Sequence, residues 1–138
     1  KESKAAVLML QIMKKAFEQD FNKYLAEGKQ VIIKITGTAD ASPINRPIAY
    51  NGQYGEYPSQ TVYKNGEPMN LSLTREEGIA TNEQLAFARA LGVKDWIEKE
   101  ITDINKMQRD YKYQIEVSSQ KGSKYRRINV QYTFVDAF

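Results

Sequence analysis

One aspartate and one arginine are the side chains of this sequence that best combine into a chemical site. Asp40 follows a run of β-branched residues typical of a buried strand, and Thr38 lies two residues before it. Asn82 and Arg89 are seven residues apart in a segment with helical periodicity, so they share one helix face. An arginine can hold a carboxylate through two parallel N–H bonds, while an aspartate binds an ammonium. Together these residues indicate a receptor for a zwitterionic ligand.

A simpler interpretation of the same residues stays open. Asp40 and Arg89 could pair with each other to fix the corner between a strand and a helix, or Asp40 could cap a turn. Spacing alone favours this structural role, because an aspartate after a strand and an arginine on a helix are both common.

The composition excludes much of enzyme chemistry. The 138 residues include no histidine and no cysteine, and 20 Lys+Arg against 17 Asp+Glu give a formal charge of +3. Nucleophiles of the Ser-His-Asp or Cys-His type, zinc sites with thiolate or imidazole ligands, and disulfides are therefore ruled out. Neither a converging pair of carboxylates nor a phosphate-binding glycine loop is evident. We expect a noncatalytic protein with no cofactor and no metal.

Two amphipathic helices are the first elements expected to position these residues. Apolar side chains recur every three or four residues over 4–27, and again from 82 to about 102. Thr81 and Gln84 have the spacing of a capping box at the start of the second helix.

Three strands are expected beside the helices. Val31–Thr36 is typical of a mostly buried strand, with Gly37–Asp40 leaving its end, and 111–117 and 128–134 alternate apolar with polar side chains. Alternation means that one face of the sheet packs on the helices. The pattern therefore predicts a single α+β domain over 1–138, with two helices on one side of a small sheet.

A long irregular insertion at about 41–80 interrupts this pattern. It contains all four prolines and four of the eight glycines, and its Asn65-Gly66 pair suits a hairpin turn between Gln60–Lys64 and Met69–Leu73. It also contains four tyrosines: Tyr50, Tyr54, Tyr57 and Tyr63. These tyrosines either pin the loop to the domain, which is the simpler interpretation, or anchor a sugar or a protein partner.

Two segments resemble the OmpA-like domain of cell-envelope proteins. They are Ile33–Asp40, which is Ile-Lys-Ile-Thr-Gly-Thr-Ala-Asp, and Asn82–Ala90, which is Asn-Glu-Gln-Leu-Ala-Phe-Ala-Arg-Ala. That family shows a strand ending in Gly-x-Thr-Asp, then a helix with Asn-x-x-Leu-Ser-x-x-Arg-Ala. Tyr125–Val130 is similar to its closing strand, Asn-Arg-Arg-Val-Glu-Ile.

The resemblance implies a βαβαββ-type sandwich with two helices on one face of a small mixed sheet. The family's first strand is not legible before Lys4, which suggests that it was trimmed or lost, and 41 residues separate Asp40 from Asn82.

The resemblance also implies that the domain binds peptidoglycan noncovalently and anchors a larger protein to the cell wall. In such domains an aspartate and an arginine hold the amino and carboxylate groups of diaminopimelate in the stem peptide. These roles fall on Asp40 and Arg89, with Thr38 beside them. Asn82 would orient the site, and Arg127 would lie nearby on the last strand. The implied location is the periplasmic side of the cell envelope, associated with the outer membrane, with membrane contact only through a segment upstream of Lys1.

Two other functions stay open. The fold could serve as an interaction or assembly domain that binds a neighbouring envelope protein through Tyr50, Tyr54, Tyr57 and Tyr63. The basic hairpin at Lys121–Arg127 could bind RNA, but a solvated turn is the simpler account, so no nucleic acid is expected.

Overall fold

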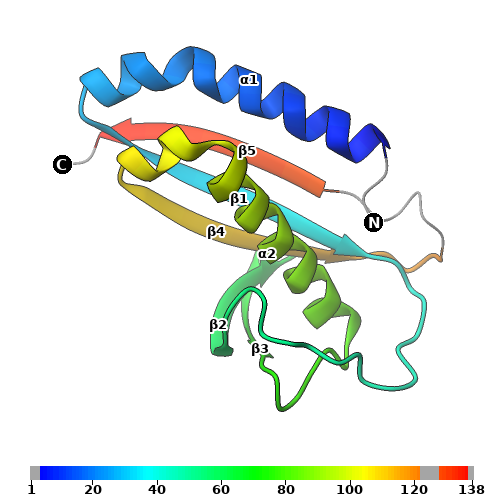
Figure 1. Ribbon diagram of the computed structural model, residues 1–138. Coiled ribbons are helices and arrows are strands. Elements are labelled where there is room, and N and C mark those ends of the chain that lie inside the picture. The colour runs from blue at the N-terminus through cyan, green and yellow to red at the C-terminus, as the bar shows by residue number, and fades with distance from the viewer. Residues whose placement is uncertain (1–3, 122–127, 137–138) are drawn as a thin grey trace.

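Two helices lie on one face of a five-stranded mixed sheet in the computed structural model, which describes residues 4–121 and 128–136 (Figure 1). The strand order is β3-β2-β4-β1-β5, and the sheet confirms the expected α+β class. The elements in chain order are α1 (Lys4–Ala26), β1 (Lys29–Ala39), β2 (Tyr57–Lys64), β3 (Glu67–Leu73), α2 (Asn82–Glu100), the 3₁₀ helix η1 (Thr102–Lys106), β4 (Arg109–Val117) and β5 (Ile128–Asp136).

The strand β1 lies between β4 and β5 in the sheet. It pairs in parallel with β4 and antiparallel with β5. Its residues Val31, Ile33 and Ile35 are fully buried, as expected for a β-branched run between two neighbouring strands. The strand continues to Ala39, three residues beyond the end expected from sequence, so Gly37 lies inside the ladder and not in a loop.

Both helices pack on the face of the sheet that carries Ile33. On α1, the ring of Phe17 lies 4.9 Å from that of Tyr132, which is opposite Ile33 on β5. On β1, Gly37 has the same strand parity as Ile33 and lies directly under α2. The opposite face is polar at its centre, where the hydroxyl of Thr36 lies 3.4 Å from Oε1 of Gln114.

The helices begin and end close to where the periodicity places them. On α1 the core face consists of Leu10, Phe17 and Phe21, with Met13 and Tyr24 partly buried beside them.

Within the described residues, neither helix combines the length and the apolar content needed to cross a membrane.

The predicted hairpin in the insertion is present and is longer than expected. The strands β2 and β3 pair antiparallel around Asn65 and Gly66, which have φ values of 54° and 78°, as a type I′ turn requires. The strand β2 also pairs in parallel with β4, at Tyr63 opposite Gln114 and Lys64 opposite Ile115. The insertion therefore extends the central sheet by two strands, a role that the sequence pattern did not predict.

The backbones of α2 and β1 approach each other closely at Gly37. A Cβ atom at this position would collide with the carbonyl oxygen of Ala86 and crowd the backbone nitrogen of Ala90. Since neither atom is the flexible end of a side chain, only a residue without a side chain allows the helix to lie this low over the strand.

We expect Gly37→Ala to lower the free energy of unfolding by about 3 kcal/mol, because the new methyl group must push α2 away from the sheet. Denaturant unfolding followed by circular dichroism measures this loss. The matched control is Gly92→Ala on α2, where the added Cβ would meet only the end of the Tyr54 side chain, with the hydroxyl at 3.1 Å, and alanine favours the helix. We expect the control to change stability by less than about 1 kcal/mol. Equal effects of the two substitutions would contradict the close contact.

Candidate ligand site at the end of β1

The carboxylate of Asp40 is held in place by the backbone around it. Its Oδ1 accepts a hydrogen bond from the backbone N–H of Ser42 at 2.9 Å. On either side of it, Ala39 accepts a bond from Ser118 and Ala41 donates one to Gln120, at 2.9 and 3.0 Å. Asp40 is only 4% exposed. The end of β1 therefore presents a fixed and nearly buried anion.

Arg89 brings a cation to the same strand end. Its Nη1 donates a hydrogen bond of 2.8 Å to the backbone carbonyl of Thr38, two residues before Asp40. A guanidinium is planar, so this bond orients the whole group. The bond forms because Gly37 lets α2 lie close to β1. Arg89 thus contacts the backbone two residues before Asp40, and a shared ligand site stays a prediction.

Thr38 contributes its backbone to this corner. By strand alternation its side chain lies on the face opposite Gly37, and hence opposite α2. Thr38 is buried, and the group that meets Arg89 is its carbonyl oxygen.

Asn82 reaches Asp40 through one intermediate residue. Its Nδ2 donates to the backbone carbonyl of Ser42 at 3.1 Å, and the N–H of Ser42 donates to Asp40. Asn82 therefore orients the site indirectly, by fixing the turn that holds the carboxylate. Sequence reasoning did not name Ser42, although an aspartate side chain often accepts the backbone N–H two residues further on, in an Asx turn.

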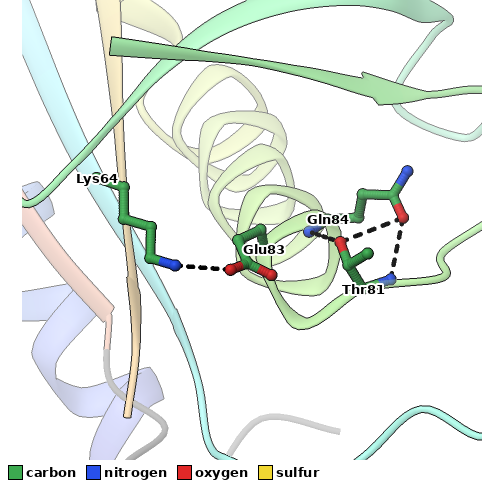
Figure 2. Close-up of polar contacts among 4 residues, drawn as sticks. All are labelled: Lys64, Thr81, Glu83 and Gln84. Carbon is green, nitrogen blue, oxygen red and sulfur yellow. Dashed lines mark hydrogen bonds and ion pairs between the residues drawn. The ribbon is translucent and has the colours of Figure 1, made fainter. Parts of the chain in front are cut away.

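The first turn of α2 is held by its own cap and by the hairpin (Figure 2). Thr81 and Gln84 form the predicted capping box, with the backbone N–H of Gln84 donating to the Thr81 hydroxyl at 3.1 Å. The Gln84 amide also donates to the carbonyl of Ser72 on β3 at 2.8 Å. From β2, the Lys64 ammonium lies 2.6 Å from the carboxylate of Glu83. The hydrogen bond from Lys64 lowers the pKa of Glu83. The N-terminal turn of α2, which begins at Asn82, is thus bonded to β2 and β3 of the insertion.

Three of the four insertion tyrosines face into the domain. Tyr50 is buried, and its hydroxyl donates to the carbonyl of Gly55 at 2.7 Å. Tyr54 lies against Gly92, and the ring of Tyr57 makes an edge contact with Phe87 at 5.4 Å. These contacts fit the simpler interpretation, in which the tyrosines pin the loop to the domain. Tyr63 is the one exposed member of the four, at 39% exposure. Partner binding through the four tyrosines stays a prediction.

Tyr57 and Arg89 use different sides of α2. At about 100° per residue, Arg89 lies within about 20° of Asn82 around the helix but about 160° from Phe87, the contact of Tyr57. The hairpin therefore supports α2 from the side away from Arg89.

The remaining candidates lie outside the part of the chain that the structure describes, or fall at its limits. Arg127, Arg126 and Lys124 belong to the undescribed 122–127, whereas Lys121 is exposed at the end of the described segment. Across residues 4–121 and 128–136, no group of three or more acidic side chains could hold a metal ion.

Comparisons with protein-family models, with curated proteins and with solved structures give no match to this chain. A function for the site must therefore be argued from its own residues and from the motif resemblance.

The Lys64–Glu83 contact should make stability depend on pH in one direction. Because the pKa of Glu83 is lowered in the folded state, its stabilising contribution is complete above the ordinary value of 4.5 and is lost as the pH falls through the folded-state value. We expect Glu83→Gln to cost up to about 1 kcal/mol at neutral pH, and the gap between the variant and the parent to close in acid. Denaturant unfolding at a series of acidic pH values measures this stability difference. Glu67→Gln, an exposed carboxylate on the same hairpin, is the control. An equal cost of Glu83→Gln at all pH values would contradict the ion pair.

Proposed function

We propose that this chain is a noncatalytic cell-envelope domain of OmpA-like type that binds the peptidoglycan stem peptide and anchors a larger protein to the cell wall. The observation that carries the proposal is the bond from Arg89 to the carbonyl of Thr38, which holds a cation within two residues of the buried Asp40.

The charges suit one end of diaminopimelate. That end of the residue carries an ammonium and a carboxylate on the same carbon atom, so it requires an anion and a cation at one place. An aspartate binds the ammonium and the arginine fork binds the carboxylate, each through charge-assisted hydrogen bonds.

The burial of Asp40 has a consequence for binding. At 4% exposure the carboxylate is covered by protein, so a ligand ammonium must displace neighbouring groups to reach it. Moving those groups lowers the net affinity, whereas the reduced contact with water strengthens each ion pair that forms. We expect selective but modest binding of a single stem peptide, made effective in the wall by the many copies that peptidoglycan presents.

The order and the connections of the residues support the same assignment. Asp40, Asn82 and Arg89 occur in the order that the family motif requires, and Asn82 is joined to Asp40 through Ser42. This chain of hydrogen bonds gives Asn82 the orienting role that the resemblance implies.

Substitutions that remove one charge each test the proposal, with binding to insoluble peptidoglycan as the measurement. We expect Asp40→Asn and Arg89→Gln each to reduce the retained fraction at least about tenfold, because each leaves one ligand charge unpaired. Asp110→Asn and Arg46→Gln, which change side chains exposed elsewhere, are matched controls and should bind like the parent. Circular dichroism checks that all four variants are folded. Undiminished retention of Asp40→Asn and Arg89→Gln would rule out this site.

Competition by soluble peptides tests the ligand chemistry. A stem tripeptide ending in meso-diaminopimelate should release the bound protein, whereas the same tripeptide ending in lysine should not, because lysine lacks the second carboxylate. Release by both peptides at the same concentration would contradict recognition of the zwitterion.

A further inference from the structure

The helix α1 has a second apolar stripe, in which Ile12 and Ala16 are exposed and Met9 is partly buried. Met9, Ile12 and Ala16 recur at spacings of three and four, and lie about 120° around the helix from the buried Leu10 and Phe17. Ile12 is 61% exposed. A surface helix usually has one apolar stripe and a polar remainder, and a helix that is apolar on several sides is usually buried. This second set, called here the outer stripe, is thus typical of an interface.

The strand β5 is an unprotected edge of the sheet. It pairs with β1 on one side and ends the strand order on the other. Its nine residues contain no proline, glycine or lysine, and its one charge, Asp136, lies at the end. The other edge strand, β3, has Glu67 and Pro68 at its start, features that block pairing with another strand. Within residues 4–121 and 128–136, the edge at β3 is therefore protected against pairing, whereas no strand pairs with the outer edge of β5.

The strand β5 can pair antiparallel with a second copy of itself about its central residue. A two-fold axis at Tyr132, the central residue of Ile128–Asp136, brings all nine residues of one copy opposite those of another. This register keeps the faces of the sheet matched, because paired residues have the same parity. Val130 meets Phe134 on the face that α1 covers, and Gln131 meets Thr133 on the polar face.

The same two-fold axis brings the two copies of α1 side by side. Since α1 contacts both β1 and β5, its axis lies over the boundary between them. Strands are about 4.8 Å apart, so each helix would lie about one strand spacing from the two-fold axis. The two helices would then be about 10 Å apart, which is a normal packing distance. One symmetric arrangement thus accounts for both the open edge and the outer stripe.

We infer that the outer edge of β5 and the outer stripe of α1 form a dimer interface, occupied by a second copy of this chain. The two sheets join into one ten-stranded sheet, with the two α1 helices packed antiparallel above the junction. The hydroxyl of Tyr132, which in the described residues is buried without a hydrogen-bond partner, then lies beside its equivalent at the two-fold axis. This inference does not depend on the wall-binding function.

Sedimentation equilibrium of the 138-residue chain tests the interface. We expect a reversible dimer in the micromolar range. The double variant Gln131→Lys, Thr133→Lys places four ammonium groups around the two-fold axis, on exposed positions that the monomer tolerates, and should weaken the dimer at least about tenfold. Thr61→Lys, Asn70→Lys makes the same change at exposed positions of the hairpin and should leave the dimer intact. Ile12→Glu should also weaken it, through the helix contact.

A charge-complementation experiment makes the test specific for strand pairing. The variant Gln131→Glu, Thr133→Glu should be monomeric alone and form a heterodimer when mixed with the lysine variant. A monomeric parent chain throughout the micromolar range would overturn the inference. A dimer that survives the lysine substitutions would also overturn it, because the copies would then meet through another surface.

Discussion

The contact between the backbones of α2 and β1 at Gly37 determines the geometry of the candidate site. Because no side chain separates the two elements there, the carbonyl of Ala86 lies directly over the strand. Arg89, three residues later on the same helix, can then reach the carbonyl of Thr38 one residue beyond the glycine. A helix raised by even one methyl group would carry the guanidinium away from the strand end. The position of the cation relative to Asp40 is therefore a result of core packing.

The insertion also holds α2 in place. Its hairpin adds two strands to the sheet and holds the first turn of α2 through Gln84 and Glu83. Its first residues, at Ser42, join the turn after Asp40 to Asn82. Its tyrosines pack inward against α2 at Phe87 and Gly92. A segment that looks irregular in the sequence thus serves chiefly to hold the helix that carries Arg89.

Local sequence patterns predicted the helices and turns well. The features that they did not predict depend on contacts between residues far apart in the chain. Both helices, the capping box of Thr81 and Gln84, and the turn at Asn65-Gly66 follow from residues close together in the chain. The pairing of β2 with β4 did not follow, because a hairpin pattern does not identify the third strand that it joins. Gly37 was expected to leave the strand, since a glycine often does, yet here it remains in the ladder to accommodate a helix 49 residues away at Ala86.

The contacts around Asp40 and Arg89 could not be predicted from spacing. Spacing put Asp40 at a strand end and Arg89 on a helix face. In the structure Arg89 bonds the carbonyl of Thr38, and Asp40 accepts a bond from Ser42. The backbone carbonyl of Thr38 could not have been chosen from sequence, because every residue has one.

The proposed binding of the zwitterionic end of a stem peptide at this corner can be measured by titrating the ¹⁵N-labelled protein with a tripeptide ending in meso-diaminopimelate. We expect saturable shifts in the backbone amides of Ser42 and Asn82 and in the guanidinium signal of Arg89. Those signals should stay unchanged with the tripeptide ending in lysine. Shifts confined to the hairpin or to α1, or none at millimolar peptide, would contradict it.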